Sequence, residues 1–212
     1  MKIEIWSDIM CPFCYIGKRK FEAALAAFDN KDVVEIEWKS FMLAPELQTD
    51  TTKNIHQFLA DHKGMSLEEA TGMNDNVAHM AAQVGLTYNF DKSIVANSFN
   101  AHRFLHFAKQ HGKQQEAEEL VFQAYFTDGK NIDSAETLMG IATSLGLDAQ
   151  AFAAAMGSGA FADEVLADID EAQQLGVRGV PFFVFDRKYA VSGAQDPAVF
   201  LQTLEKSFEE AV

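Results

Sequence analysis

The sequence predicts an α/β protein whose sheet is built from both ends of the chain, with a large all-helical domain inserted between them. Strand-like alternation of apolar and polar residues occurs before residue 40 and again after residue 180, whereas the intervening residues show helical spacing. The predicted order of elements is therefore βαβ, a helical block, then ββα. Because neither end completes a sheet alone, we expect a discontinuous domain of residues 1–45 and 176–212, with residues 46–175 as the inserted helical domain.

The first part of the chain predicts two parallel strands joined by a helix. Lys2–Trp6 and Val33–Trp38 alternate with period two, and residues 11–28 carry apolar side chains at helical spacing. A right-handed crossover makes the strands parallel and places Cys11 at the carboxyl end of the first strand. Open α/β sheets carry their functional groups at that edge, so we expect chemistry there.

The middle of the chain predicts roughly six or seven helices between about Asn54 and Gln174, separated by glycines. Ser66 with Glu69, and Asp133 with Glu136, have the spacing of capping boxes at helix starts. Strand signals return only after residue 180, where Phe182–Phe185 and Tyr189–Ser192 predict a hairpin. A final helix is expected from about Pro197 to Glu209, since proline favours the first helical turn.

Composition and charge argue against several classes of partner. The chain has 31 acidic and 17 basic residues, for a net charge of −14. Nucleic acids and anionic membranes attract clustered Lys and Arg, so neither is expected as a partner. No apolar run approaches the roughly 20 residues of a membrane span. The residues after Met1 lack the apolar core of a signal peptide, and we therefore expect a cytoplasmic protein.

The two cysteines are the strongest functional signal, because the chain has no others and they lie together in Cys11-Pro12-Phe13-Cys14. At the first turn of a helix, unpaired backbone N–H groups and the helix dipole favour a thiolate, the species that attacks disulfides. The alternatives are a structural disulfide, half of a zinc site and two unreactive thiols. Zinc needs two further ligands and a reducing compartment disfavours structural disulfides, so we expect a redox pair and no metal.

Other candidate site residues lie far from the cysteines in the sequence. Pro181 begins a predicted strand, where a cis Val180–Pro181 bond would leave the Val180 backbone free to pair with an extended substrate; a trans proline is the alternative. His102 and His106 lie one helical turn apart. His102 or Arg103 is a candidate proton carrier or positive charge near the thiols, and a packed or solvent-facing helix is the alternative.

Residues close to the cysteines in the sequence raise further expectations. Glu4 and Asp8 are candidate carboxylates near Cys14, although an exposed strand acid and a helix-start acid are the ordinary roles of such residues. If Cys11 is reactive, its sulfur must be accessible, and Phe13 is expected to face solvent.

Several segments together resemble the DsbA-family oxidoreductases of the FrnE type, and the resemblance covers essentially the whole chain. These segments are Ser7–Gly17, Asn97–Arg103, Gly176–Phe185 and Val191–Gln195. The resemblance implies a thioredoxin-like fold with a helical insertion, and thiol–disulfide exchange with Cys11 as nucleophile and Cys14 as resolving thiol. It also implies a cis-proline substrate loop at Val180–Pro181.

The expected substrate-binding residues are Pro12, Phe13, His102 and the Val180–Pro181 loop. The expected partners are protein or small-molecule thiols and disulfides, no cofactor is expected, and both monomer and homodimer remain open. The periplasmic oxidants of this superfamily have a His where this chain has Phe13. Phenylalanine cannot donate a strong hydrogen bond to a thiolate, so we expect the poise of an isomerase or reductase rather than a strong oxidant.

Two other functions remain as alternatives. The superfamily also resembles kappa-class transferases and hydroxychromene-carboxylate isomerases, which would use glutathione as co-substrate on an aromatic small molecule. Those proteins typically keep one activating Ser or Cys where this chain has a pair, so Cys14 argues against this function. A non-enzymatic holdase that presents apolar helices to unfolded chains is the third possibility.

Overall fold

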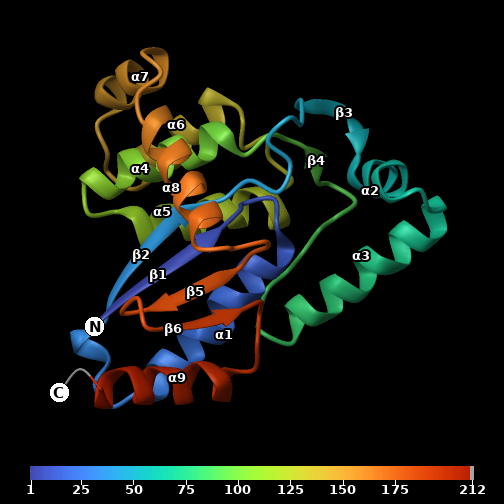
Figure 1. Ribbon diagram of the computed structural model, residues 1–212. Helices are drawn as coiled ribbons and strands as arrows, with labels where there is room; N and C mark the ends of the chain where they lie inside the picture. Colours follow the sequence, from blue (N-terminus) through green and yellow to red (C-terminus); the bar gives the residue numbers. More distant parts are fainter. Residues whose placement is uncertain (211–212) are drawn as a thin grey trace. The chain divides into compact units, whose positions relative to one another are not determined.

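A computed structural model describes residues 1–210 of the chain (Figure 1). The chain divides into two compact units: unit 1 is Met1–Leu43 with Leu166–Val212, and unit 2 is Ala44–Val165. The second boundary between them falls within helix α8 (Ala162–Gln174), rather than at residue 176 as the sequence organisation suggested.

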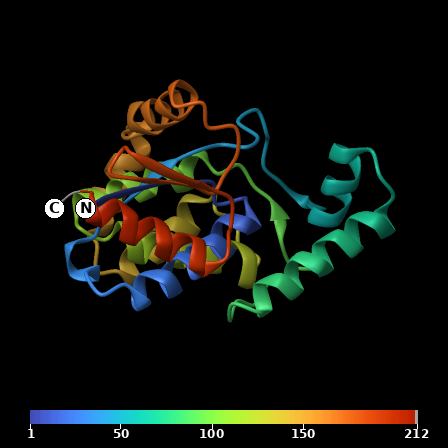
Figure 2. The same ribbon diagram turned by 60° about the horizontal axis from the view of Figure 1, so that its bottom comes forward.

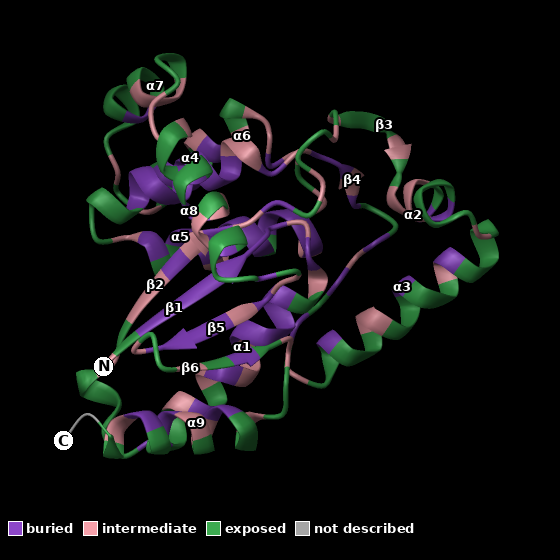
Figure 3. Ribbon diagram, viewed as in Figure 1, coloured by how far each residue is buried: buried purple, intermediate pink, exposed green. Residues whose placement is uncertain are grey.

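Unit 1 contains a four-stranded sheet in the order β2-β1-β5-β6. Its strands are β1 (Lys2–Ser7), β2 (Glu35–Ser40), β5 (Phe182–Phe185) and β6 (Tyr189–Ser192). β1 pairs in parallel with β2 and antiparallel with β5, which pairs antiparallel with β6. β1 is therefore an inner strand and is buried along nearly its whole length (Figure 3). The two ends of the chain build one sheet, as the order of elements predicts.

One face of this sheet packs against two helices, α1 (Pro12–Ala27) and α9 (Pro197–Glu209), which lie side by side (Figure 2). Successive strand residues point to opposite faces, so Ile3 and Ile5 of β1 both face these helices. The buried core of this face consists of Ile3, Ile5, Phe21, Ala24, Phe28, Trp38, Phe183, Phe185, Val191, Phe200 and Leu204. Phe21 of α1 makes edge or tilted ring contacts with several of them, which fixes α1 on the sheet.

The opposite face of the sheet carries a second, smaller core. Trp6 and Val184 pack there with Ala172 of α8 and with Val177. The indole N–H of Trp6 donates to the backbone carbonyl of Asp168, at 2.9 Å, which ties β1 to α8. The sheet of unit 1 is thus covered by helices on both faces.

Unit 2 is mainly helical. Its helices are α2 (Ile55–Lys63), α3 (Leu67–Ala82), α4 (Phe99–Gln110), α5 (Gln114–Phe122), a π-helical turn at Gln123–Thr127, α6 (Ala135–Ser144), α7 (Ala149–Gly157) and the first residues of α8. Ser66 and Glu69 form the predicted capping box of α3. The capping box predicted at Asp133 is wrong, because Ser134 is the N-cap of α6 and the Asp133 carboxylate instead accepts hydrogen bonds from Thr49 and Asn100.

Two local features differ from the sequence expectation. A short antiparallel ladder of β3 (Asp50–Asn54) and β4 (Ile94–Val95) interrupts the helices of unit 2. In unit 1, a 3-10 turn occupies Lys31–Val33, so β2 begins at Glu35 rather than at Val33. Throughout residues 1–210, every helix is too short or too polar to cross a membrane.

Candidate active site

The thiol pair lies where β1 passes into α1. Cys11 is the N-cap of α1 and Pro12 is its first residue, a position that needs no backbone donor. The turn before the helix is held by Asp8, whose backbone carbonyl accepts from the Cys11 N–H at 2.9 Å. The Asp8 carboxylate also accepts from the N–H groups of Met10 and Leu43, at 3.2 and 2.7 Å. These bonds fix the point at which α1 begins and therefore the position of Cys11.

The two cysteines are free, and their surroundings differ. Cys14 is completely buried, whereas Cys11 keeps 4% of its surface exposed. Burial raises the pKa of the Cys14 thiol well above its ordinary value of 9.0, and the adjacent Cys11 raises it further. Hydrogen bonds from the Asp8 backbone and the Ser7 hydroxyl act in the opposite direction without offsetting this rise. Cys14 therefore stays protonated near neutral pH.

The loop before β5 lies against Cys11. The Val180–Pro181 peptide bond is cis, and the Cys11 thiol donates to the Val180 carbonyl with a sulfur–oxygen distance of 3.6 Å. The Pro181 carbonyl accepts from the Gly193 N–H at 2.8 Å, which ties the loop to the end of β6. The fold thus brings together residues that are about 170 positions apart in the sequence.

Gly17 is a residue of this site that the sequence reasoning did not single out. A Cβ atom on Gly17 would lie 2.8 Å from Pro181 Cγ and 3.4 Å from Ala194 Cβ. Glycine therefore allows the first turns of α1 to approach the proline loop closely. The sequence did offer one indication of this role, because a glycine inside a predicted helix lowers stability and therefore needs a packing or functional reason.

The remaining residues near Cys11 include an exposed aromatic ring. Phe13 is 38% exposed, and Pro12 beside it is partly exposed. The Cys11 thiol itself is less accessible than the sequence reasoning required, because the side chain is nearly buried. A reactant must therefore reach the sulfur through a narrow opening or after a small movement of its neighbours.

The expected position of Glu4 near Cys14 is wrong. Glu4 alternates with Ile3 and Ile5 along β1, so its side chain lies on the sheet face that α8 covers, opposite to α1. There it is buried and paired with the guanidinium of Arg187, which also bonds Glu171 of α8 at 2.8 Å. Arg187 in turn lies 5.8 Å from the centre of the Trp6 ring. Glu4 therefore holds the sheet to α8.

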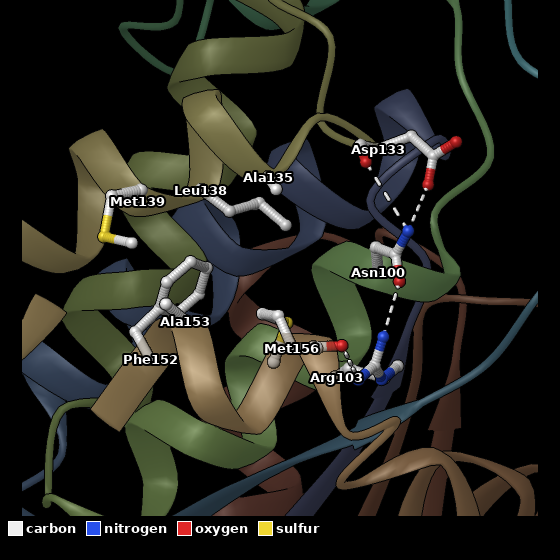
Figure 4. Close-up of a pocket in the computed structure, with 10 residues that line it drawn as sticks. Asn100, Arg103, Asp133, Ala135, Leu138, Met139, Phe152, Ala153 and Met156 are labelled. Atoms are coloured by element: carbon white, nitrogen blue, oxygen red, sulfur yellow. Dashed lines mark hydrogen bonds between the residues drawn. The ribbon is translucent and has the colours of Figure 1, made fainter. Parts of the chain in front are cut away.

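The polar residues of the 97–103 segment have structural contacts within unit 2. Arg103 donates to the backbone carbonyls of Ala155, Met156 and Ala160, at 3.2, 2.9 and 2.8 Å, and to the side chain of Asn100 (Figure 4). These bonds join α4 to the end of α7 and the turn that follows. The guanidinium is therefore used to hold unit 2 together.

His102 is buried within α4, with 2% of its surface exposed, so its assignment as a substrate-binding residue remains a prediction. Beside Arg103 lies a pocket of about 340 Å³. Its lining is mostly apolar, with Asn100 and Asp133 at one edge (Figure 4). Across the described part of the chain, three or more His, Cys, Asp or Glu residues nowhere gather as a metal site would require.

A four-stranded sheet of this topology, with a thiol pair at the start of α1 and a cis-proline loop against it, defines a DsbA-like thioredoxin domain. Residues 2–205 match the family model described as a DSBA-like thioredoxin domain, and the chain belongs to this family. It is also 41% identical to a probable DsbA oxidoreductase from Streptomyces coelicolor, with 99% of this chain and 91% of that chain covered and a TM-score of 0.93.

Two further relatives are more distant. An uncharacterized protein of Bacillus subtilis, YwbO, is 28% identical over 93% of this chain and 92% of its own length. The cytosolic disulfide reductase DsbM of Pseudomonas aeruginosa shares the fold, at 16% identity and a TM-score of 0.70, with 99% of each chain covered. That reductase has also been solved with glutathione.

Proposed function

We propose that the protein is a thiol–disulfide oxidoreductase or isomerase in which Cys11 is the nucleophile and Cys14 the resolving thiol. The contact between Cys11 and the carbonyl of Val180 carries this proposal. A substrate that is extended along the Val180–Pro181 loop would place its disulfide against the Cys11 sulfur at the start of α1.

The reaction follows from this arrangement in two exchanges. The Cys11 thiolate attacks one sulfur of a substrate disulfide, so that a mixed disulfide forms and the other substrate sulfur leaves as a thiolate, which takes a proton from water. Cys14 then loses its proton and attacks Cys11, which forms the Cys11–Cys14 disulfide and releases the second substrate thiol. Two electrons pass to the substrate. The reverse sequence oxidises a dithiol.

The different burial of the two cysteines supports the assignment of roles. Cys11 keeps some exposed surface and Cys14 keeps none, so an external disulfide meets Cys11 first. In the reduced protein, iodoacetamide should therefore modify Cys11 and leave Cys14 unmodified, as mass spectrometry of proteolytic peptides would reveal. Preferential modification of Cys14, or of neither residue, would contradict the assignment.

Two variants test the mechanism directly. Cys11→Ser should abolish the reduction of a protein disulfide, because no nucleophile remains. In Cys14→Ser, Cys11 should still attack the substrate disulfide, but no thiol remains to resolve the mixed disulfide. Mixed disulfides with the substrate should therefore accumulate and appear on non-reducing gels. Equal activity in the two variants would overturn the proposal.

Phe13, which precedes Cys14, supports a reduction potential typical of a reductase or an isomerase. The Phe13 side chain is apolar and the residue is 38% exposed, and a phenyl ring cannot donate a strong hydrogen bond to the Cys11 thiolate. Equilibration with graded glutathione buffers should give a low reduction potential. Phe13→His should raise it, because a histidine can stabilise the reduced form. A potential already as high as that of the periplasmic oxidants would contradict this poise.

We further propose a cytoplasmic location and glutathione as a small thiol partner. Support comes from the reducing poise expected of Phe13 and from the glutathione-bound relative described above. A glutathione transferase or isomerase that uses Cys11 alone is the competing function. Turnover of an aromatic substrate by Cys14→Ser, with saturable dependence on glutathione, would favour that competitor.

A further inference from the structure

Ser7 is a buried polar residue directly behind the thiol pair. It is the last residue of β1 and only 1% exposed, and it lies opposite Ser40 of β2. Its backbone carbonyl accepts from the N–H of Phe41 at 2.9 Å, so its position is fixed. Ser7 has the same parity along β1 as Ile3 and Ile5, and its side chain therefore faces α1.

Cys14 lies in the first turn of α1, the helix that covers the sheet face on which the Ser7 side chain lies. Hydrogen bonding from the Ser7 hydroxyl and from the Asp8 backbone each acts to lower the pKa of the Cys14 thiol, against the effect of burial. Because Cys14 is fully buried, bulk water cannot reach that sulfur when it becomes charged. Protein donors must then supply the stabilisation that water would otherwise give.

We propose that Ser7 is a positioning residue for the resolving thiol: its hydroxyl holds the Cys14 sulfur and stabilises the negative charge that forms on it during resolution. This role rests on the function proposed above. In that step the S–H bond of Cys14 breaks, a bond forms between the two cysteine sulfurs, and the bond from Cys11 to the substrate breaks. The substrate sulfur leaves with the electron pair and gains a proton through water, which balances the proton that Cys14 has lost.

A hydroxyl suits this position for a physical reason. A buried cation would stabilise the thiolate more strongly, but it would be costly whenever Cys14 is a neutral thiol. A serine is neutral in both states and can donate to the thiolate or accept from the thiol. Ser7 can therefore contact the Cys14 sulfur before and after ionisation, and it adds no permanent charge to the buried site.

The test separates the two exchange steps. Reduced protein is mixed with dipyridyl disulfide, which releases one thiopyridone when Cys11 attacks and a second when Cys14 resolves the mixed disulfide. The first absorbance phase depends on reagent concentration, and the second does not. In Ser7→Ala, the second phase should slow about tenfold or more, because a hydrogen bond to a charged group is lost. Its pH profile should move to higher pH, while the first phase keeps its rate.

Matched variants distinguish a specific role from a structural one. Ser40→Ala removes a buried hydroxyl from the strand residue opposite Ser7 and should leave both phases unchanged. Ser7→Thr keeps the hydroxyl and should restore the position of the pH profile, even if its extra methyl group lowers stability. The role of Ser7 would be refuted if the second phase of Ser7→Ala kept its rate and its pH profile, or if both phases slowed equally. Absence of a second phase in the unmodified protein would instead refute the proposed function.

Discussion

Gly17 of α1 lies against Pro181 of the cis-proline loop, so closely that a Cβ atom on Gly17 would come within 2.8 Å of Pro181 Cγ. Real Cβ atoms essentially never make contacts this short. The proline ring is itself held through its carbonyl by Gly193. Neither partner can therefore move freely, and the glycine sets the spacing between the thiol-bearing helix and the loop.

Gly17→Ala should destabilise the protein and slow disulfide exchange. An added methyl group must push α1 and the proline loop apart, and overpacking of this kind costs about 1–3 kcal/mol. Urea denaturation should show the loss of stability, and insulin reduction should show the slower exchange. Gly72→Ala in α3 is the matched control, since a Cβ there meets nothing within 4 Å. It should be neutral or stabilising by about 0.5–1 kcal/mol, because alanine favours helices. Equal effects at the two glycines would contradict the close approach.

Stability of the reduced protein should fall as the pH rises above about 9. Burial raises the pKa of the Cys14 thiol above its ordinary value of 9.0. The unfolded chain therefore loses this proton first, so the stabilisation is complete below the unfolded pKa and is lost as the pH rises toward the folded pKa. Urea denaturation between pH 8 and 10 should show a slope of at most about 1.4 kcal/mol per pH unit from this group.

Two comparisons isolate the contribution of Cys14 to that slope. The oxidised protein and Cys14→Ala have no Cys14 thiol to ionise, so both should lack this part of the pH dependence. The pKa of Lys2 is raised by its hydrogen bond with Glu37, but this group acts only near 10.5 and above. An identical slope in the reduced protein and in Cys14→Ala would show that another group is responsible.

Local sequence signals were sufficient for most of the sheet of unit 1. The hairpin strands at Phe182–Phe185 and Tyr189–Ser192 and the helix from Pro197 to Glu209 agree with the structure in their boundaries. Each has a strong apolar pattern and a proline or a tight turn at its end. The β3–β4 ladder could not be predicted in this way, because Asp50–Asn54 is polar and its partner strand has two residues far along the chain.

The thiol pair could be found from sequence alone, but its supporting residues could not. Cys11 and Cys14 are recognisable by their spacing, whereas Ser7 and Gly17 act through contacts that exist only after β1, α1 and the proline loop have packed. Glu4 shows the reverse error: it is near Cys14 in the sequence, but strand alternation turns it to the other face. Glu4 lies between the apolar residues Ile3 and Ile5, and this alternation could have placed its side chain on the sheet face opposite to theirs.

The effects of Glu4 and Arg187 on the free energy of unfolding should be coupled, because the two residues form an ion pair. The Glu4 side chain is 3% exposed, so removal of the Arg187 guanidinium leaves a buried carboxylate and should be costly. The Arg187 side chain is 45% exposed, so solvent weakens the attraction between the two charges. A double-mutant cycle with Glu4→Gln and Arg187→Gln, measured by urea denaturation, should give a coupling of about 1–2 kcal/mol. The exposed pair Lys113 and Glu116 is the control, with an expected coupling below about 0.5 kcal/mol. Similar couplings for the two pairs would argue against a structural role for Glu4.

Arg103→Lys should destabilise unit 2 although the positive charge is kept. The Arg103 guanidinium reaches three backbone carbonyls and Asn100 at once, and the single ammonium of lysine cannot reproduce that fork. Each of these partly buried hydrogen bonds that lysine fails to make should cost about 0.5–1.5 kcal/mol, which thermal denaturation should register as a lower Tm. Arg178→Lys, at an exposed position, should change stability by less than about 0.5 kcal/mol. If Arg103→Lys were as stable as the original protein yet slower in disulfide exchange, the residue would act on the reaction rather than on the packing of α4 and α7.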